Sequence, residues 1–286
     1  MEAKQPDPVE FRDGQRQQWN AAATGWRKWS ELIDGAASGV SGRLVELAGV
    51  EPGSRVLDVA AGYGEPSLTA ARTAGPDGSV VATDISAEMI AFGRERAAAA
   101  GLENIEFVES DAVGLDFAEA SFDAALSRWG IIFDPDGEAA AARVRGFLKP
   151  GARMAISSWG SPERVPFLAI PMRTAMQRLD VAPPPPGTPG PLSRPSPEAL
   201  GGLLGAAGFS DLEVEETEVT FEWRSPEEFT TFVKEIAPPI RAIIDPHPQE
   251  VQDETWAAIT DAIRGEAADD GAVRLSNLAL LAVGRA

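Results

Sequence analysis

The residues best suited to bind a ligand follow a short apolar run near residue 55. The run is RVLDVA (residues 55–60), and AGYGE (residues 61–65) comes directly after it. Small residues and two glycines behind a strand allow a ligand to approach the backbone before the next helix begins. A purely structural glycine-rich turn would have the same composition, so the neighbouring residues must decide between the two.

Two details of this turn favour a cationic ligand over a dinucleotide. The dinucleotide fingerprint needs a third glycine at position 67, where this chain has Ser67. Glu65 stands where the helix N-terminus would otherwise receive a pyrophosphate. A carboxylate there repels a diphosphate. Together with Asp58, it suits S-adenosylmethionine, which carries a sulfonium, an ammonium and no phosphate.

Two further carboxylates follow the next two strand-like runs. Asp84 ends SVVATD, twenty residues after Gly64, where an acidic side chain accepts hydrogen bonds from a ribose diol. Asp111 follows IEFVES (residues 105–110), where a carboxylate can take an adenine amino group. The alternatives are that Asp84 caps the following helix and that Asp111 is an ordinary loop residue. Acidic residues at successive strand ends favour a ligand at the carboxyl edge of an open α/β sheet.

These carboxylates share an edge only if strands and helices alternate along the chain. Short apolar runs bounded by glycine predict buried parallel strands at 55–60, 79–84, 105–110, 122–128 and 152–159. Helices are expected at 66–74, at 87–100 with Ser86 as N-cap and Gly101 at the C-cap, and at 136–148. Lys149-Pro150-Gly151 is expected to end the last of these helices. The alternation implies a parallel sheet with right-handed crossovers.

The second half of the chain has a different character. Prolines crowd residues 183–197, which excludes a helix or a central strand there. A helix at 198–209, a strand at 212–223 and a final strand at 275–285 follow, with a helical insertion between the two strands. The expected division is an N-terminal helical segment (1–45), a cofactor-binding core (46–160), a cap segment with the Pro-rich loop (161–197), more core (198–224), a helical cap insertion (225–272) and the last strand (273–286).

Composition excludes several classes of function. There is no cysteine and one histidine, so we expect no disulfide, thiolate or histidine-based metal site. A net charge of −19, from 44 acidic and 25 basic residues, disfavours nucleic acid as a partner. With no apolar stretch of transmembrane length and no signal-like N-terminus, the chain is expected to be cytoplasmic and not membrane-bound. Oligomeric state is not readable from the sequence.

The ordered motifs resemble those of class I S-adenosylmethionine-dependent methyltransferases, most closely the group related to ubiquinone/menaquinone-biosynthesis methyltransferases. The motifs are VLDVAAGYGEPSLTAAR, ATDISAEMI, VESDA, SFDAALSRWGIIFDPD and FLKPGARMAISSWG. The resemblance extends from about residue 47 to 159, and the two final strands fit the same fold. It implies a Rossmann-like α/β fold with a seven-stranded, mostly parallel sheet whose last strand is antiparallel, here with helical cap insertions.

The resemblance also implies roles for individual residues. Gly62 and Gly64 would lie at the methionine moiety, Asp84 at the ribose and Asp111 at the adenine, while Met89 lies near the adenine or is plain core. The other cofactor-binding candidates are Asp58, Ala60, Glu65, Ile85, Ala112 and Ser127. The candidates facing a methyl acceptor are Arg128 and Trp129 after the fourth strand, and Tyr63, which replaces a commoner small residue.

The expected reaction is direct SN2 methyl transfer from S-adenosylmethionine to a small, hydrophobic or aromatic acceptor. The alternatives are an NAD(P)-dependent oxidoreductase, although no Tyr-x-x-x-Lys pair is present, and a non-catalytic S-adenosylmethionine-binding protein. Segments 161–197 and 225–272 are expected above the carboxyl edge of the sheet, enclosing the acceptor. Trp19, Trp26 and Trp29 either fold over the cofactor or pack against the sheet. His247, between two prolines, is expected in an exposed turn and not as a general base.

Overall fold

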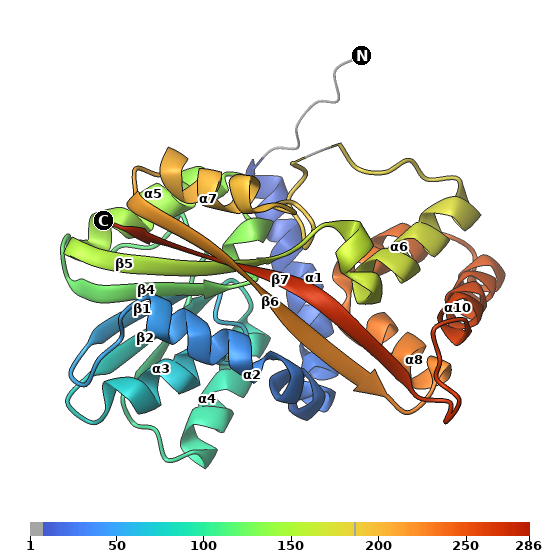
Figure 1. Cartoon of the computed structure of the whole chain (residues 1–286), viewed down its shortest axis with the longest axis horizontal. Coiled ribbons are helices and arrows are strands. Elements are labelled where there is room, and N and C mark those ends of the chain that lie inside the picture. The colour runs from blue at the N-terminus through green and yellow to red at the C-terminus, as the bar shows by residue number, and fades with distance from the viewer. Residues whose placement is uncertain (1–7, 186) are drawn as a thin grey trace.

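Seven strands form one mixed sheet in the middle of the protein (Figure 1). The computed structural model describes residues 8–185 and 187–286. The strands lie in the order β3-β2-β1-β4-β5-β7-β6. Their bounds are β1 Arg55–Val59, β2 Ser79–Asp84, β3 Ile105–Glu109, β4 Phe122–Arg128, β5 Leu148–Trp159, β6 Ser210–Trp223 and β7 Val273–Arg285. Strands β1 to β5 pair in parallel, and β7 is antiparallel to both β5 and β6. This confirms the predicted sheet.

Helices cover both faces of this sheet. On β4, Ala124 and Leu126 pack in the same cluster as α2 (Ser30–Leu47) and α3 (Ser67–Ala74), and α4 (Ala87–Ala99) packs beside α3. Ala125, between them, packs in the cluster of α5 (Gly137–Phe147) and α7 (Pro197–Ala206) on the opposite face. Because successive residues point to opposite faces, central strands buried on both sides carry apolar residues on both faces over most of their length.

The connection between β3 and β4 is formed by a turn and by apolar packing, in a segment where no helix was predicted. Residues 110–121, between β3 and β4, contain no helix. The carboxylate of Asp111 accepts a hydrogen bond from the Gly114 backbone N–H, which forms a local turn in place of a helical one. Apolar side chains after this turn pack against β4 and α5. Leu115 is fully buried, and the Phe117 ring lies 5.2 Å from Phe122 and 5.5 Å from Phe147.

The predicted start of helix α4 is confirmed, whereas the predicted break between α5 and the next strand is not. Ser86 caps α4, since its hydroxyl accepts a hydrogen bond from the Met89 backbone N–H. In contrast, Lys149-Pro150-Gly151 does not separate α5 from the next strand, because β5 already begins at Leu148. Leu148 pairs with Phe122, and the register between β4 and β5 shifts just after this pair. The proline therefore lies at an irregularity of the ladder, where a missing N–H is tolerated.

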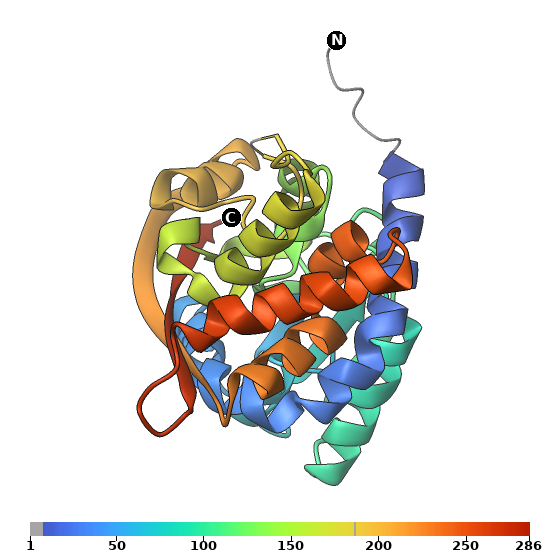
Figure 2. The same cartoon turned by 90° about the vertical axis from the view of Figure 1, so that its right-hand side faces the viewer.

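The antiparallel pair β6–β7 extends beyond the rest of the sheet and supports a helical cap. Residues 279–285 of β7 pair with β5, whereas the whole of β7 pairs with β6. The part of β7 before residue 279 therefore forms a two-stranded arm past the end of β5. Helices α8 (Pro226–Ile236), α9 (Pro238–Ile244) and α10 (Gln249–Arg264) connect the two strands at the end of this arm. Together with α6 (Pro166–Leu179), which packs against α10, they form the cap (Figure 2).

Asn277 joins the arm to the cap. Its side chain is fully buried, and its amide N–H groups donate to the carbonyl oxygens of Val219 (3.2 Å) and Leu275 (2.8 Å). Its carbonyl oxygen accepts from the Phe167 backbone N–H at 3.1 Å, at the start of α6. An amide uses both donors and its acceptor here, so this polar side chain is satisfied inside an apolar arm.

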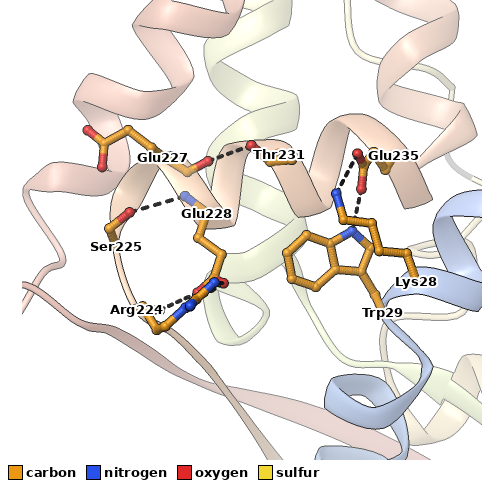
Figure 3. Close-up of polar contacts among 8 residues, drawn as sticks. All are labelled: Lys28, Trp29, Arg224, Ser225, Glu227, Glu228, Thr231 and Glu235. Atoms are coloured by element: carbon orange, nitrogen blue, oxygen red, sulfur yellow. Dashed lines mark hydrogen bonds and ion pairs between the residues drawn. The ribbon is translucent and has the colours of Figure 1, made fainter.

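The N-terminal helix α1 (Pro8–Lys28) is held against the cap. Gly25 approaches the backbone of Glu235 so closely that a Cβ at this position would lie 2.2 Å from the Glu235 carbonyl oxygen. Beside it, the Trp26 indole donates to the carbonyl oxygen of Ile236 at 3.0 Å, at the end of α8. The Glu235 carboxylate accepts from Trp29 Nε1 at 2.6 Å and Lys28 Nζ at 2.8 Å (Figure 3). The junction of α1 with α2 is thereby fixed to α8.

In the part of the chain that the structure describes, no helix is both long enough and apolar enough to cross a bilayer.

Candidate functional site

A cavity lies between the carboxyl ends of the parallel strands, helix α1 and the cap. The space open to the centre of a water molecule is about 210 Å³. Its wall combines the ends of β1, β2 and β4, residues of α1, and residues of α6, α8 and α9. Residues from both segments that the sequence assigned to a cap, 161–197 and 225–272, therefore contribute to this wall.

The cavity brings together most of the predicted site residues. Those in its wall are Ala60, Gly62, Tyr63, Glu65, Asp84, Ile85, Met89, Asp111, Ala112, Arg128 and Trp129. Three predicted residues, Asp58, Gly64 and Ser127, are not part of the wall. Each is next in the chain to a residue of the wall, namely Val59, Glu65 and Arg128.

Asp84 connects the glycine-rich turn to helix α4. One of its carboxylate oxygens accepts from the Gly62 backbone N–H and the other from the Ser86 backbone N–H, each at 2.8 Å. The side chain is 7% exposed, and this burial raises its pKa to about 6. Asp84 therefore orders the start of α4, as the capping alternative expected, and it also lines the cavity, while its contact with a ribose stays a prediction. Each carboxylate oxygen has a second lone pair available for a ligand.

Glu65 places a carboxylate at the N-terminal end of α3. Its Oε2 atom accepts from the Thr69 hydroxyl at 2.8 Å, and its Oε1 lies 3.9 Å from Arg72. Gly62 and Gly64 have positive φ values of 55° and 109°, so the turn before Glu65 takes a path that a side chain would strain. A Cβ on Gly62 would contact no other atom within 4 Å. The backbone of this turn is therefore open to the cavity.

Asp58 is a buried carboxyl group with an unused acceptor. Its Oδ2 accepts from the Ser67 hydroxyl at 2.5 Å, whereas Oδ1 is buried and has no hydrogen-bond partner in the described residues. Burial raises the pKa of Asp58 to about 7, although the Ser67 hydrogen bond and the positive charge of Arg128 oppose the shift. A cation close to this group would favour its ionised form.

Asp111 lies at the other end of the carboxyl edge. Besides its turn with Gly114, its carboxylate lies 3.5 Å from Arg12 Nε of helix α1. Arg12 also lines the cavity. A second contact from α1 comes from Asn20, whose side-chain oxygen accepts from the Ser86 hydroxyl at 2.7 Å. Helix α1 therefore closes one side of the cavity by polar contacts with both the β2 and the β3 ends.

Two residues without glycine's freedom adopt left-handed backbone at neighbouring strand ends. Ala60 after β1 has φ 56° and Trp129 after β4 has φ 52°, a costly conformation that the surroundings must enforce. Ser127 helps, since its hydroxyl donates to the Val59 carbonyl at 2.8 Å and accepts from the Ile131 N–H at 2.9 Å. At Gly130, a Cβ would lie 2.5 Å from the Ala60 Cβ. The two strand ends are thus locked together.

Tyr63 is in the wall, but its hydroxyl is occupied elsewhere. The phenol donates to Asp34 at 2.8 Å, and Arg96 both pairs with Asp34 and donates to the Tyr63 carbonyl oxygen at 3.1 Å. The side chain is 2% exposed, and burial raises the pKa of its phenol above the ordinary value. Tyr63 therefore offers the cavity its ring, and its proton remains on the phenol.

Most of the apolar wall was not predicted from the sequence. Trp19 and Trp26 line the cavity, whereas Trp29 packs against Phe232 of α8, a cap helix and not a strand of the sheet, with ring centroids 5.5 Å apart. The unpredicted wall residues from the ends of the sheet and the cap are mainly aromatic or aliphatic, namely Ile33, Phe133, Trp159, Phe167, Leu168, Met172, Pro191, Phe221, Phe232, Ile236, Pro238, Pro239 and Ile240. The spacing of these residues in the sequence is that of ordinary core residues, so it did not indicate that they line a cavity.

His247 lies away from the cavity. It occupies the turn between α9 and α10 and is half-buried, rather than fully exposed as the flanking prolines suggested. It is not part of the cavity wall. Its backbone carbonyl accepts from Gln252 Nε2 at 2.8 Å, which anchors this turn to α10.

The buried carboxyl of Asp58 predicts a pH dependence of stability. Its folded-state pKa of about 7 lies above the value of about 4 in an unfolded chain. Between these values the folded protein keeps a proton that the unfolded chain has lost. The free energy of unfolding should therefore fall as pH rises towards 7, by up to about 1.4 kcal/mol per pH unit.

Urea titrations between pH 5 and 8 on the wild type and Asp58→Asn test this expectation. Asp84 contributes in the same direction up to pH about 6, so the difference between the two curves isolates Asp58. We expect the variant to have the shallower dependence. Parallel curves would show that Asp58 is ionised in the folded protein throughout this range.

Comparison with known proteins identifies the core of this fold. Residues 56–151 match the family model of a methyltransferase domain. The chain is 41% identical over 116 residues to an uncharacterized protein of Mycobacterium tuberculosis, covering 41% of each chain. It is 37% identical over 138 residues to the ubiquinone/menaquinone biosynthesis C-methyltransferase UbiE of Pseudomonas putida, covering 46% of this chain and 54% of that protein. The chain thus spans about half the length or less of the curated relatives it matches.

The fold extends further than the sequence similarity. The crystal structure of the YcgJ protein from Bacillus subtilis aligns with a TM-score of 0.56 over 87% of this chain and 98% of that one, at 18% identity. At this identity the likeness concerns the fold alone. Residues 56–151 therefore match a methyltransferase domain, similar in sequence to the ubiquinone/menaquinone biosynthesis C-methyltransferases, and the fold of the chain is similar to that of a solved S-adenosylmethionine-dependent methyltransferase from Aquifex aeolicus (TM-score 0.50 over 75% of this chain).

Proposed function

We propose that this protein is an S-adenosylmethionine-dependent methyltransferase that acts on a small, hydrophobic or aromatic acceptor. The observation that carries the proposal is the row of carboxylates Glu65, Asp84 and Asp111 in the wall of one cavity, at the carboxyl edge of the sheet. The rest of the wall of this cavity is mainly aromatic and aliphatic. The carboxylates would suit a cationic nucleoside, and the apolar wall would suit an apolar acceptor.

The residues present fit the cofactor. The open backbone at Gly62 offers room for the methionine part, and a cation bound there would favour the ionised form of the buried Asp58. Asp84 has free lone pairs for the ribose hydroxyls, and Asp111, with Ala112 beside it, is available to the adenine amino group. Ile85 and Met89 supply apolar contacts to the base. When bound, the cofactor would supply a methyl group activated by its sulfonium.

The charge at the start of α3 argues against a dinucleotide. A helix N-terminus normally attracts phosphate through its free N–H groups and dipole. Here Glu65 lines the cavity at this helix end and its side chain is mostly buried. Two like charges in such a setting repel strongly. An NAD(P)-dependent oxidoreductase is therefore disfavoured.

In the proposed reaction, the residues of the chain act by position and by excluding water. The cap, helix α1 and the strand ends enclose the acceptor, so the reacting groups meet in a fixed orientation, which can lower a barrier substantially. The stacked rings of Trp129 and Trp159, 4.3 Å apart, give the acceptor a flat apolar surface. No covalent nucleophile is needed for a direct methyl transfer, and the Tyr63 phenol is held by Asp34.

Replacement of Asp84 tests the cofactor half of the proposal. Asp84→Ala should weaken binding of S-adenosylhomocysteine by roughly 1.5–3 kcal/mol, since charge-assisted hydrogen bonds to the ribose are lost. Calorimetry on the folded variants measures this. Asp84→Asn keeps one carbonyl acceptor and should lose less. Asp77→Ala, an exposed position before β2, is the matched control and should bind as wild type. Unchanged affinity in Asp84→Ala would remove Asp84 from the ribose site.

Replacement of His247 tests whether the only histidine serves as a general base. General bases contribute about 100- to 10,000-fold to rates, and His247 is absent from the cavity wall. With an acceptor identified by methyl transfer from S-adenosylmethionine across a panel of aromatic compounds, His247→Ala should keep kcat within a few-fold of wild type. A loss beyond about 100-fold, with cofactor binding retained, would show that this turn reaches the acceptor.

A further inference from the structure

Arg128 is a buried cation in the wall of the cavity. It ends β4, its side chain is 8% exposed, and its Nη1 donates to the Ser41 hydroxyl of α2 at 2.9 Å. None of its nitrogen atoms lies within 4.0 Å of a carboxylate oxygen among residues 8–185 and 187–286. A guanidinium has five N–H donors, and a buried charge without a counter-ion is costly. Arg128 therefore has donors left for a ligand.

The other charged groups of the wall are already partnered. Arg12 faces Asp111, Glu65 accepts from Thr69, and Asp84 accepts from two backbone N–H groups. Asp58 interacts electrostatically with Arg128 but makes no ion pair with it, and burial holds the pKa of Asp58 near neutrality. Although the protein has a net charge of −19, Arg128 places a positive charge without an ion-pair partner in the wall of the cavity.

Trp129 supplies a second unused donor next to this cation. Its Nε1 is buried and has no hydrogen-bond partner in the described part of the chain. The Arg128 guanidinium lies 5.3 Å from the Trp129 ring centroid, and the ring stacks on Trp159 at 4.3 Å with 8° between the planes. The left-handed φ of 52° and the Ser157 hydroxyl, which accepts from the Trp129 backbone N–H, hold the ring in place. An indole N–H is a donor only, so its partner must be an acceptor atom.

The surroundings of these two donors are apolar and mostly aromatic. Phe167 and Phe221 contact Trp159 with ring centroids 4.9 and 6.4 Å away, and both line the cavity. Water enclosed among such rings finds few partners. An acceptor atom for Arg128 and Trp129 is therefore best supplied by a ligand whose remaining surface is flat and apolar.

We propose that the methyl acceptor is a planar, mainly apolar molecule carrying an anionic oxygen, and that Arg128 and Trp129 Nε1 bind this oxygen. The proposal rests on the proposed function and names its substrate class. It assigns Arg128 a role in specificity: a neutral molecule of the same shape would leave the buried guanidinium without a counter-ion. The cofactor also has a carboxylate, in its amino-acid part, so the experiment must separate the two sources.

Calorimetry with paired aromatic probes tests the proposal on the full chain saturated with S-adenosylhomocysteine. The probes are benzoate, 2-naphthoate and anthracene-2-carboxylate, each compared with its carboxamide. We expect the wild type to bind at least one acid roughly tenfold or more tightly than its amide, as one charge-assisted hydrogen bond implies. Arg128→Gln should abolish the preference and Arg128→Lys should keep part of it. Arg178→Gln, which removes an exposed α6 arginine paired with Glu254, should leave it unchanged.

Three results would overturn the proposal. The first is a wild type that prefers no acid over its amide, a result that needs no variant to fold. The second is an Arg128→Gln variant that keeps the preference. The third is an Arg128→Gln variant that binds S-adenosylhomocysteine more weakly but methylthioadenosine, which lacks the amino-acid part, as well as wild type; this would assign the guanidinium to the cofactor. Failure of the wild type to bind S-adenosylhomocysteine would contradict the proposed function itself and is read out separately.

Discussion

The carboxylate of Asp84 is the interaction on which the geometry of the cavity depends. One side chain at the end of β2 accepts N–H groups from the glycine-rich turn after β1 and from the N-cap of α4. Without it, two backbone donors would be left unpaired inside the protein, and the turn would lose its fixed distance from α4. The same carboxylate lines the cavity, so the group that orders the ligand-facing backbone is also available to the ligand.

The remaining walls follow from how the cap is held. The arm formed by β6 and β7 carries α8 to α10 past the end of β5, and Asn277 ties it to α6. Helix α1 is fixed to α8 through Gly25 and Trp26, and it reaches the strand ends through Arg12 and Asn20. The cavity is therefore enclosed by segments far apart in sequence, each attached to the edge of a rigid sheet. Such an enclosure suits a reaction that needs alignment and the exclusion of water.

The sequence predicted the half of the site that is built from local motifs. A strand, a turn with glycines at positive φ and a carboxylate at the next strand end are coded within about 60 residues, so Gly62, Glu65, Asp84 and Asp111 could be placed on one edge. The mostly parallel seven-stranded sheet with its antiparallel last strand followed from the same alternation together with a resemblance to a known fold. The β3–β4 connection, for which no helix was predicted, is formed by the Asp111 turn and the packing of Phe117.

The acceptor half could not be predicted in the same way, because its residues come together only through tertiary packing. Phe167, Phe221 and Phe232 have the spacing of ordinary core residues, and nothing local shows that they face a cavity. The hydrogen-bond and ion-pair partners of a side chain also depend on tertiary packing. The sequence named Tyr63 and Arg128 as equivalent candidates, yet Asp34 occupies the Tyr63 hydroxyl while no described carboxylate pairs with Arg128.

We infer that this carboxyl edge, with Glu65 at the start of α3, selects a cationic nucleoside and rejects a diphosphate. Calorimetric titration of the wild-type protein at neutral pH with S-adenosylmethionine and, separately, with NADH tests this inference. We expect saturable binding of S-adenosylmethionine with a Kd below about 100 μM, about −5.5 kcal/mol or tighter, and NADH binding at least about 100-fold weaker. Equal or tighter binding of NADH would contradict it.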